Sequence, residues 1–263
     1  MAEDESLVLV DKVGRNKNIA LITLNRQKSL NSLNESMLNQ LRKTFKALKD
    51  DKNVRAIIIY AEGKSWCAGV DLKWASSLGW RIIKAIKMGQ KVFAQIEKHP
   101  TPVIAAINGY AIGGGMELSL SCDIRIASDS AIFGQTETSV GLLPGWGGTY
   151  RLPKTVGLSV AKDLIYTSRK FTAEEALEIN LVSKIVSSDE LKNQAIEMAE
   201  SVSENAPVAV REAKKAIRKG LHKSLKTGYC AEVQGVRYCI RTKDIREGIK
   251  AVFEKRKPEF KGK

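Results

Sequence analysis

The sequence predicts an α/β fold in which short buried strands alternate with amphipathic helices. The β-branched runs at 54–60 and 102–107 have the length and composition of buried strands. Residues 34–50 carry apolar side chains at helical spacing. Glycine-rich loops follow both strands and lead into helical segments. The chain has 263 residues and 43% apolar content, which is enough for one sizeable core with a smaller appendage.

Residue patterns place the individual elements in chain order. Strands are expected at 7–13 and 19–24, where they form an opening hairpin, and then at 54–60, 102–107, 123–127, 131–133 and 182–186. Helices are expected at 34–50, about 71–98, 114–121, 157–167, after a capping box at 172–176, and at 189–205 and 206–219.

The segment at 108–117, Asn-Gly-Tyr-Ala-Ile-Gly-Gly-Gly-Met-Glu, combines a strand end, three glycines and a helix start. Glycines at such a junction expose backbone amides, and the helix dipole adds partial positive charge there. The junction is suited to hold a negatively charged oxygen. Glu117 lies one turn further along the helix.

A second strand-loop-helix segment at 63–72 has the same design, because Gly69 permits a tight turn and Asp71 is a plausible helix N-cap. Each loop alone also fits an ordinary turn in which glycine relieves crowding. Together they can aim two amides at one oxygen and form an oxyanion hole. Each donor in such a hole stabilises a transition state by roughly 3–4 kcal/mol.

These two segments, in this order, resemble those of the crotonase family of enoyl-CoA hydratases and isomerases. Eight ordered blocks carry the resemblance along nearly the whole chain: 22–26 with 30–33, 67–71, 108–117, 122–127, 133–137, 141–148, 244–248 and 253–256. The resemblance implies a crotonase-like spiral of repeated ββα units over residues 1–190, which holds an acyl-CoA site. It also implies a C-terminal α-helical domain at 191–263 that drives trimer formation, with trimers pairing into hexamers.

The resemblance assigns the oxyanion amides to Val70 and Gly114, and the oxygen to the thioester carbonyl of an acyl-CoA. Family hydratases carry glutamates at the positions of Glu117 and Glu137, and two carboxyl groups can divide the proton transfers of water addition. The expected enzyme is an enoyl-CoA hydratase or, in reverse, a 3-hydroxyacyl-CoA dehydratase. One departure is Thr136, where compared hydratases usually have proline, which puts the aim of Glu137 in question.

The resemblance also implies a set of substrate-binding residues: Lys28, Leu30 and Ala68 near the adenine end, Asp71 and Leu72 after the first loop, Gly145 holding the attacking water, Trp146 at the acyl pocket, and Lys255 reaching CoA. Simpler interpretations remain for three of them. Gly145 fits a plain turn, Trp146 fits core packing, and Lys255 fits an exposed surface. No metal ion and no redox cofactor is expected, because the CoA thioester is itself the substrate.

Composition argues against several other classes. The four cysteines form no CxxC pair and there are two histidines, which argues against a zinc site. A GxSxG nucleophile motif is missing, and no GxGxxG follows the first strand. No apolar run approaches the roughly 20 residues of a membrane span. The acidic residues 1–6 do not have the pattern of a signal or transit peptide, so a cytoplasmic protein is expected.

The formal net charge of +14 indicates attraction to polyanions. Coenzyme A is one, and nucleic acid is another. The chain shows no arginine-rich tract and no aromatic stacking motif, which argues against nucleic acid. Two alternatives to the hydratase remain open: a Δ3-Δ2-enoyl-CoA isomerase or other enolate chemistry, and an RNA-binding protein with the crotonase fold. The glutamate pair favours an enzyme, because a pure binding protein needs no such pair.

Overall fold

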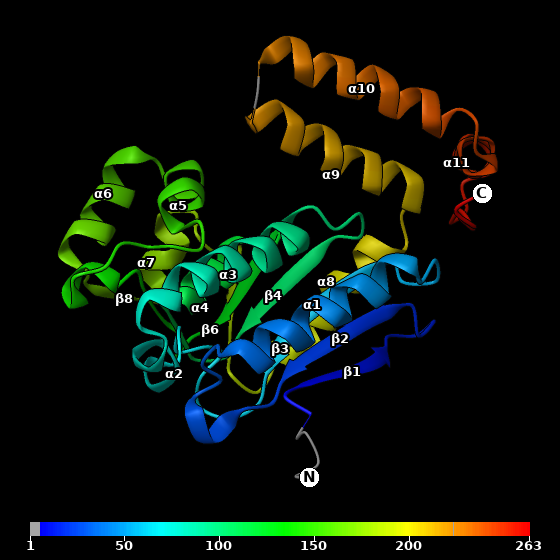
Figure 1. Cartoon of the computed structure of the whole chain (residues 1–263). Coiled ribbons are helices and arrows are strands. Elements are labelled where there is room, and N and C mark those ends of the chain that lie inside the picture. The colour runs from blue at the N-terminus through cyan, green and yellow to red at the C-terminus, as the bar shows by residue number, and fades with distance from the viewer. Residues whose placement is uncertain (1–5, 223) are drawn as a thin grey trace.

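In the computed structural model, residues 6–222 and 224–263 are described, so most of the acidic segment at the start lies outside the description. A six-stranded sheet forms the centre of the molecule (Figure 1). Its strands, in spatial order, are β1 (Val8–Val13), β2 (Ile19–Leu24), β3 (Ala56–Ala61), β4 (Val103–Ile107), β6 (Ile124–Ser128) and β9 (Lys184–Val186). β1 pairs antiparallel with β2, which confirms the opening hairpin, and the other pairings in this sheet are parallel.

A second, smaller sheet contains β5 (Tyr110–Ile112), β7 (Ile132–Gly134) and β8 (Lys170–Thr172). Two isolated parallel bridges, Leu33 to Val70 and Cys67 to Ala111, add earlier parts of the chain to this layer. The strands β2, β3, β4 and β6 are therefore each followed by a short extended segment in the second layer and then by a helical turn or helix. Repetition of this step produces a spiral of strand-strand-helix units, and it brings both glycine loops into the same layer.

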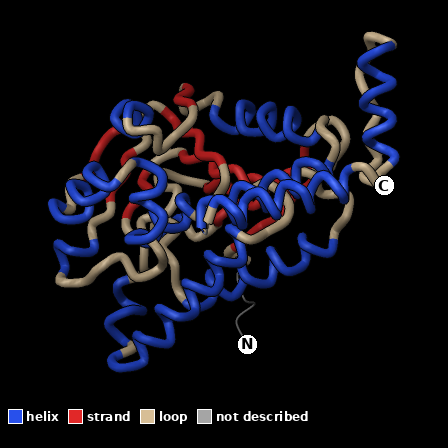
Figure 2. Tube along the Cα trace, turned by 90° about the horizontal axis from the view of Figure 1, so that it is seen from above, coloured by secondary structure: helices blue, strands red, loops and turns tan. Residues whose placement is uncertain are grey.

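The helices cover both faces of the central sheet (Figures 1 and 2). They are α1 (Glu35–Asp50), α2 (Leu72–Ser77), α3 (Ile82–Glu97), α4 (Gly114–Leu120), α5 (Gly148–Val156), α6 (Leu158–Thr167), α7 (Ala173–Glu178), α8 (Leu191–Ser203), α9 (Pro207–His222), α10 (Leu225–Cys239) and α11 (Lys243–Phe253), with 3-10 turns η1 (Gln27–Ser29), η2 (Gly79–Arg81) and η3 (Glu137–Val140).

The central strands are apolar throughout because both of their faces are buried. In β3, Ile57 and Ile59 point into the larger core, which also contains apolar residues of α1, α3 and α4. Ile58 points into a second core formed with α8. Among the described residues, no helix has both the length and the apolar composition that crossing a bilayer requires.

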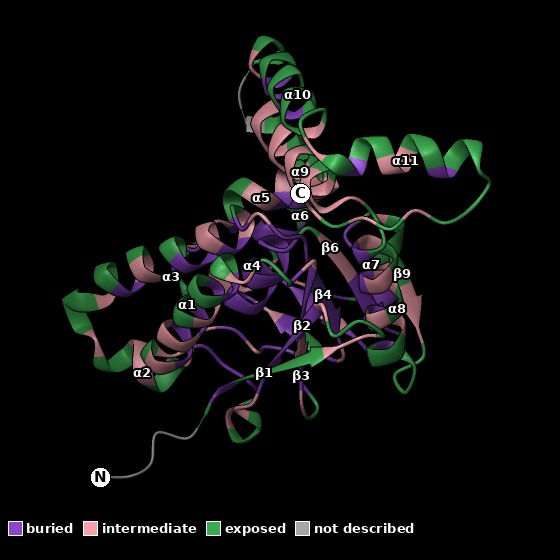
Figure 3. Cartoon of the chain, turned by 90° about the vertical axis from the view of Figure 1, so that its right-hand side faces the viewer, coloured by how far each residue is buried: buried purple, intermediate pink, exposed green. Residues whose placement is uncertain are grey.

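The last three helices extend away from the sheet (Figure 1). Figure 3 shows that α10 and α11 are exposed over much of their surface, whereas α4 lies in the buried interior. The segment after α11 returns to the sheet. Buried Asp244 accepts hydrogen bonds from the amides of Lys261 and Gly262 at 2.8 and 2.7 Å. Arg55, just before β3, donates to the Phe260 carbonyl at 2.6 Å, so this segment lies at the amino edge of the parallel strands.

Several elements differ from those that the sequence predicts. The single helix expected at about 71–98 is divided into α2 and α3, because Gly79 takes a φ of +50° at the junction. β5 and β8 have three residues each, which is too short for a recognisable alternation. α5 is also unexpected, since Pro153 lies inside it.

A buried histidine lies just after α3. His99 is 3% exposed, its Nδ1 accepts a hydrogen bond from the Thr101 amide at 3.2 Å, and its ring meets Phe45 edge-on. Burial lowers the pKa of His99 to about 4, and the nearby charges of Lys214, Arg211 and Lys49 act in the same direction, against the Thr101 backbone. The folded protein therefore favours the neutral imidazole.

We expect His99 to make the fold acid-sensitive. In the unfolded chain its pKa returns to about 6.5, so between that pH and about 4 the unfolded state binds more protons. Stability should therefore fall as the pH drops through this window, by roughly 3 kcal/mol in total. Urea unfolding at several pH values would show that the free energy of unfolding depends less steeply on pH in His99→Phe than in the wild type. Parallel curves would contradict the assignment.

Candidate active site

The two glycine loops pack directly against each other. The Ile112 amide donates to the Cys67 carbonyl at 3.1 Å, and the Cys67 amide donates to the Tyr110 carbonyl at 2.8 Å. A Cβ atom on Gly115 would overlap the Cys67 carbonyl, and one on Gly69 would lie 2.7 Å from the Ile112 oxygen. Glycine is required at these two positions because one backbone passes so close to the other.

This packing places Val70 and Gly114 side by side. Gly114 opens α4, and a Cβ atom on it would lie 3.4 Å from Cγ2 of Val70. The backbone of Leu33 bonds to Gly69 and Asp71, on either side of Val70. Neither the Val70 amide nor the Gly114 amide donates a hydrogen bond to another described residue. Two unpaired N–H groups at one place can bind an oxygen that gains negative charge.

Glu117 lies on α4 and is 2% exposed. Its Oε1 atom accepts hydrogen bonds from the amides of Trp146 and Gly148, both at 2.7 Å. Burial, followed by the charge of Glu137, raises the pKa of Glu117 to about 8, and the two amides and Arg151 oppose that shift. Near neutral pH this carboxyl group is therefore mostly protonated, and Oε2 is left to exchange a proton.

Glu137 begins η3 and faces the same backbone from the other side. Gln135 Nε2 donates to both carboxylate oxygens of Glu137, at 3.0 and 2.9 Å. A Cβ atom on Gly113 would lie 3.3 Å from Glu137 Oε1. Burial raises the pKa of Glu137, while the bond from Gln135 lowers it. The sequence has Thr136 where a proline is usual in the compared hydratases. The φ of Thr136 is −101°, outside the range of about −65 ± 15° that proline allows. Glu137 nevertheless points at Gly113.

A short chain of contacts connects the two acids. Gly148 donates to Glu117, and a Cβ atom on Gly148 would lie 2.9 Å from Gln135 Oε1. Gln135 in turn donates to Glu137. The structure thus brings Val70, Gly114, Glu117 and Glu137 around one site.

This arrangement can move protons at a carbon next to an oxyanion. Burial raises the pKa of both acids, that of Glu117 to about 8, and the bond from Gln135 opposes the shift at Glu137. Two carboxyl groups in unlike surroundings can divide the giving and the taking of a proton. Within the part of the chain that the structure describes, no three His, Cys, Asp or Glu side chains are grouped as metal ligands would be.

Three of the predicted substrate-binding residues also lie together. The Ala68 amide donates to the Leu30 carbonyl at 3.0 Å, so the first glycine loop is adjacent to the turn that contains Lys28. Lys28 and Leu30 are exposed. This surface borders the Val70 amide, which lies two residues after Ala68.

Asp71 stabilises the start of α2. It caps α2 by accepting from the Trp74 amide at 3.0 Å, as the sequence predicts, and it pairs with Arg26 at 2.7 Å. Burial favours its neutral form, but these partners outweigh burial and hold the pKa of Asp71 below its ordinary value. Leu72, the next residue, is 71% exposed at the start of α2.

Trp146 combines two roles. Its ring is 2% exposed and packs edge-on against Phe93 at a centroid distance of 5.4 Å, as the core alternative predicts. Its backbone amide nevertheless holds Glu117. The Gly145 carbonyl accepts a hydrogen bond from Gln90 at 2.8 Å, so this loop is fixed on both sides of the indole-bearing residue.

Lys255 is not close to the other predicted residues within one chain. It is exposed and follows α11, from which the chain returns to the amino edge of the sheet near Arg55. Lys28 and Ala68 follow β2 and β3, so they lie at the carboxyl edge. A strand of six residues separates these edges by roughly 20 Å.

Sequence reasoning missed Gln135 and Gly148, both of which hold the acids. Gln135 was detectable in principle, since it is a polar residue two positions before Glu137 in an otherwise apolar segment. Gly148 contributes only its amide, and a backbone donor leaves no side-chain signal in a sequence.

The chain is similar in sequence to known enoyl-CoA hydratases. A sequence model of the family described as enoyl-CoA hydratase/isomerase matches residues 14–263. The short-chain-enoyl-CoA hydratase of Clostridium acetobutylicum is 41% identical over 256 residues, covering 96% of both proteins. The crotonyl-CoA hydratase of Syntrophomonas wolfei is 39% identical over 248 residues, which cover 94% of this chain and 95% of that protein.

A solved structure is also similar to this chain. The crystal structure of enoyl-CoA hydratase from Bacillus anthracis has a TM-score of 0.95 at 42% identity, and the match covers 98% of this chain and 100% of the other. This likeness confirms the predicted α/β spiral with its C-terminal helical region.

Burial of Glu117 should reduce stability at alkaline pH. Its folded pKa of about 8 lies above the unfolded value of 4.5, so the folded state binds more protons between these pH values. Stability is therefore lost as the pH rises through this window, by at most roughly 3–5 kcal/mol. We expect Glu117→Gln to melt higher than the wild type at pH 9, and by a smaller margin at pH 5.5. A margin that does not change with pH would refute this account.

Proposed function

Because the chain belongs to the enoyl-CoA hydratase/isomerase family, whose model matches residues 14–263, we propose that it adds water across the 2,3 double bond of an acyl-CoA thioester. In reverse it would act as a 3-hydroxyacyl-CoA dehydratase. One observation carries the proposal: buried Glu117 and half-buried Glu137, in unlike surroundings, adjoin a pair of unpaired amides.

The amides of Val70 and Gly114 would bind the thioester carbonyl oxygen. When water attacks C3, electrons of the double bond move toward this oxygen and an enolate forms. Backbone donors that are already in place stabilise the developing charge without reorganising, by roughly 3–4 kcal/mol for each donor. The close contact of the two glycine loops keeps these donors fixed.

Glu117 and Glu137 would transfer the protons. The oxygen of water bonds to C3, and one carboxylate takes the proton that this water loses. The other carboxyl group gives its proton to C2, and the enolate electrons return to the new C–H bond. Oxidation states balance across the addition, so the proposed reaction requires no redox cofactor. Gly145, next to the Glu117-binding loop, would help to hold the water.

Short unbranched enoyl thioesters are the first substrates to test. The relatives at 41% and 39% identity are named for short-chain-enoyl-CoA and crotonyl-CoA. In this chain the ring of Trp146 fills the space beside Gly114, where a Cβ atom would lie 2.8 Å from the indole. A bulky ring at this position favours a compact acyl group.

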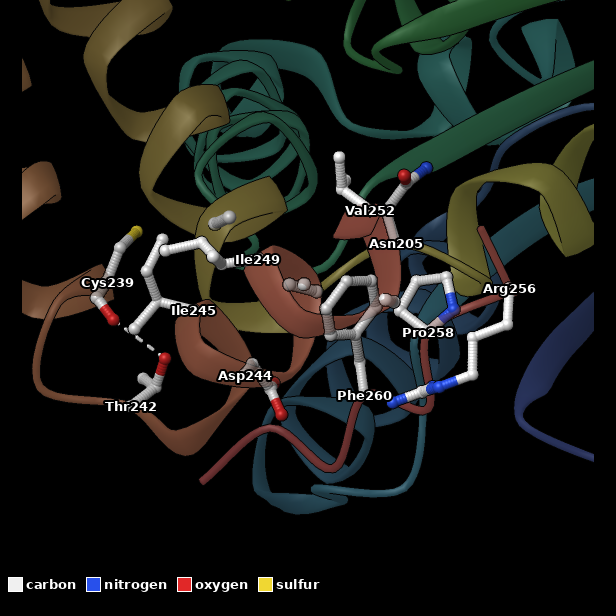
Figure 4. Close-up of a pocket in the computed structure, with 14 residues that line it drawn as sticks. Asn205, Cys239, Thr242, Asp244, Ile245, Ile249, Val252, Arg256, Pro258 and Phe260 are labelled. Atoms are coloured by element: carbon white, nitrogen blue, oxygen red, sulfur yellow. Dashed lines mark hydrogen bonds between the residues drawn. The ribbon is translucent and has the colours of Figure 1, made fainter. Parts of the chain in front are cut away.

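We further propose that the protein is a homo-oligomer formed through its C-terminal helices, as a trimer or hexamer. Large apolar side chains are exposed on α10, at its end and on α11: Tyr229, Val233 and Val236, then Ile240, then Ile249, Val252 and Phe253. An apolar cavity of about 470 Å³ lies between α9, α11 and Phe260 (Figure 4). Exposed apolar surface of this kind marks contact sites. In such an assembly Lys255 would reach the acyl-CoA of a neighbouring subunit.

The proposal predicts that both acids are needed. Crotonyl-CoA should lose its conjugated absorbance when the wild type is added, as water saturates the double bond. Glu117→Gln and Glu137→Gln should each lower kcat by roughly 10²–10⁴-fold, the usual contribution of general acid–base catalysis, with KM changed little. Circular dichroism of both variants would verify that they are folded.

Two outcomes would contradict the proposal that both acids take part in hydration. Near-normal crotonyl-CoA hydration by Glu117→Gln would remove this residue from the chemistry. Full activity of Glu137→Gln, together with faster turnover of 3-enoyl than of 2-enoyl esters, would indicate a double-bond isomerase, which needs only one acid.

A further inference from the structure

We propose that helix α3 positions Glu117 by clamping the loop at 145–148, and that Gly89 is the positioning residue on which the clamp depends. The inference rests on the proposed function and extends it to a helix whose side chains need not touch the reacting atoms. The observation behind it is that α3 contacts the loop at three places.

Two of the three contacts come directly from adjacent residues on one turn of α3, and the third, about two turns later, acts through Arg151. Gln90 donates to the Gly145 carbonyl at 2.8 Å. Gly89 lies against the indole of Trp146. Glu97 pairs with Arg151 at 2.7 Å, and Arg151 donates to the Trp146 carbonyl at 2.9 Å.

The clamped loop carries the donors that fix Glu117. The amides of Trp146 and Gly148 both bind Oε1 of Glu117 at 2.7 Å. A shift of this loop by a few tenths of an ångström would lengthen or misalign both bonds. The helix thus acts on the carboxyl group through the indole and the backbone of one residue.

The indole is held between two glycines. A Cβ atom on Gly89 would overlap the ring, lying 2.6 Å from Cδ2 of Trp146. On the other side, a Cβ atom on Gly114 would lie 2.8 Å from Cζ3. Since Gly114 supplies a predicted oxyanion amide, the ring also sets the spacing between α3 and the oxyanion loop.

Glycine inside a helix is otherwise unfavourable, because alanine loses less conformational entropy there. Gly89 lies within a helix of 16 residues and has no positive φ. Helix propensity alone would therefore make Gly89→Ala stabilising. The packing of Trp146 predicts the opposite, and it predicts a specific effect on catalysis.

Gly89→Ala tests the clamp. The added methyl group should displace the indole, weaken the two amide bonds to Glu117 and lower kcat by roughly 10–100-fold, with little change in KM. Loss of those bonds should also raise the pKa of Glu117. The limb of the kcat pH profile that reports this pKa should then move to higher pH. Gly89→Ala combined with Trp146→Phe should recover part of the activity, because the smaller ring leaves room for the methyl group.

A matched control is Gly220→Ala on α9. A Cβ atom there would lie 3.8 Å from the Cα of Gly228, an ordinary van der Waals contact, so kcat and the pH profile should remain those of the wild type. A wild-type kcat and pH profile in folded Gly89→Ala would overturn the clamp. So would an equal loss of kcat in the control.

Titration of Glu117 by carboxyl-carbon NMR separates this inference from the proposed function. If the wild type hydrated no enoyl thioester, the function would fail. The clamp would still stand if the titration of Glu117 moved upward in Gly89→Ala and not in Gly220→Ala, and it would fall if the two variants titrated alike.

Discussion

The close contact between the Cys67–Val70 and Ala111–Gly115 backbones is the constraint on which the site depends. Hydrogen bonds between Cys67, Tyr110 and Ile112 hold the two segments together, and Gly69 and Gly115 remove the Cβ atoms that would separate them. The contact leaves the amides of Val70 and Gly114 adjacent and unpaired. Because both segments follow strands of the central sheet and pair with each other in the second layer, these donors are in place before any substrate arrives.

The same packing buries Glu117, and this burial reduces the stability of the fold. α4 begins where the loops meet, so Glu117 is carried into the interior, where burial opposes its charge. The amides of Trp146 and Gly148 partly offset that cost. Gln135 does the same for Glu137. Glu117 is supported by donors from another segment of the chain and Glu137 by a neighbour two residues away, and such unlike surroundings allow two nearby carboxyl groups to differ in proton affinity.

Much of the fold and part of the site could be predicted from local pattern. The parallel strands, buried on both faces, gave clear apolar runs, and the N-cap role of Asp71 followed from residue type alone. The short strands β5 and β8 and the break at Gly79 had too little pattern to detect. Gly148 and Gly89 were equally invisible, because one acts through its amide and the other through the absence of a side chain.

The sequence by itself determined which chemical groups were available: two glycine loops after buried strands, and two glutamates at family positions. Their order along the chain was enough to indicate an enolate-stabilising site. Only the tertiary structure decided that Val70 and Gly114 lie side by side, that Glu117 is buried more deeply than Glu137, and that the segment after α11, which contains Lys255, returns to the opposite edge of the sheet. Proton affinity and distance depend on what surrounds a group in space, and those surroundings come from segments far apart in the chain.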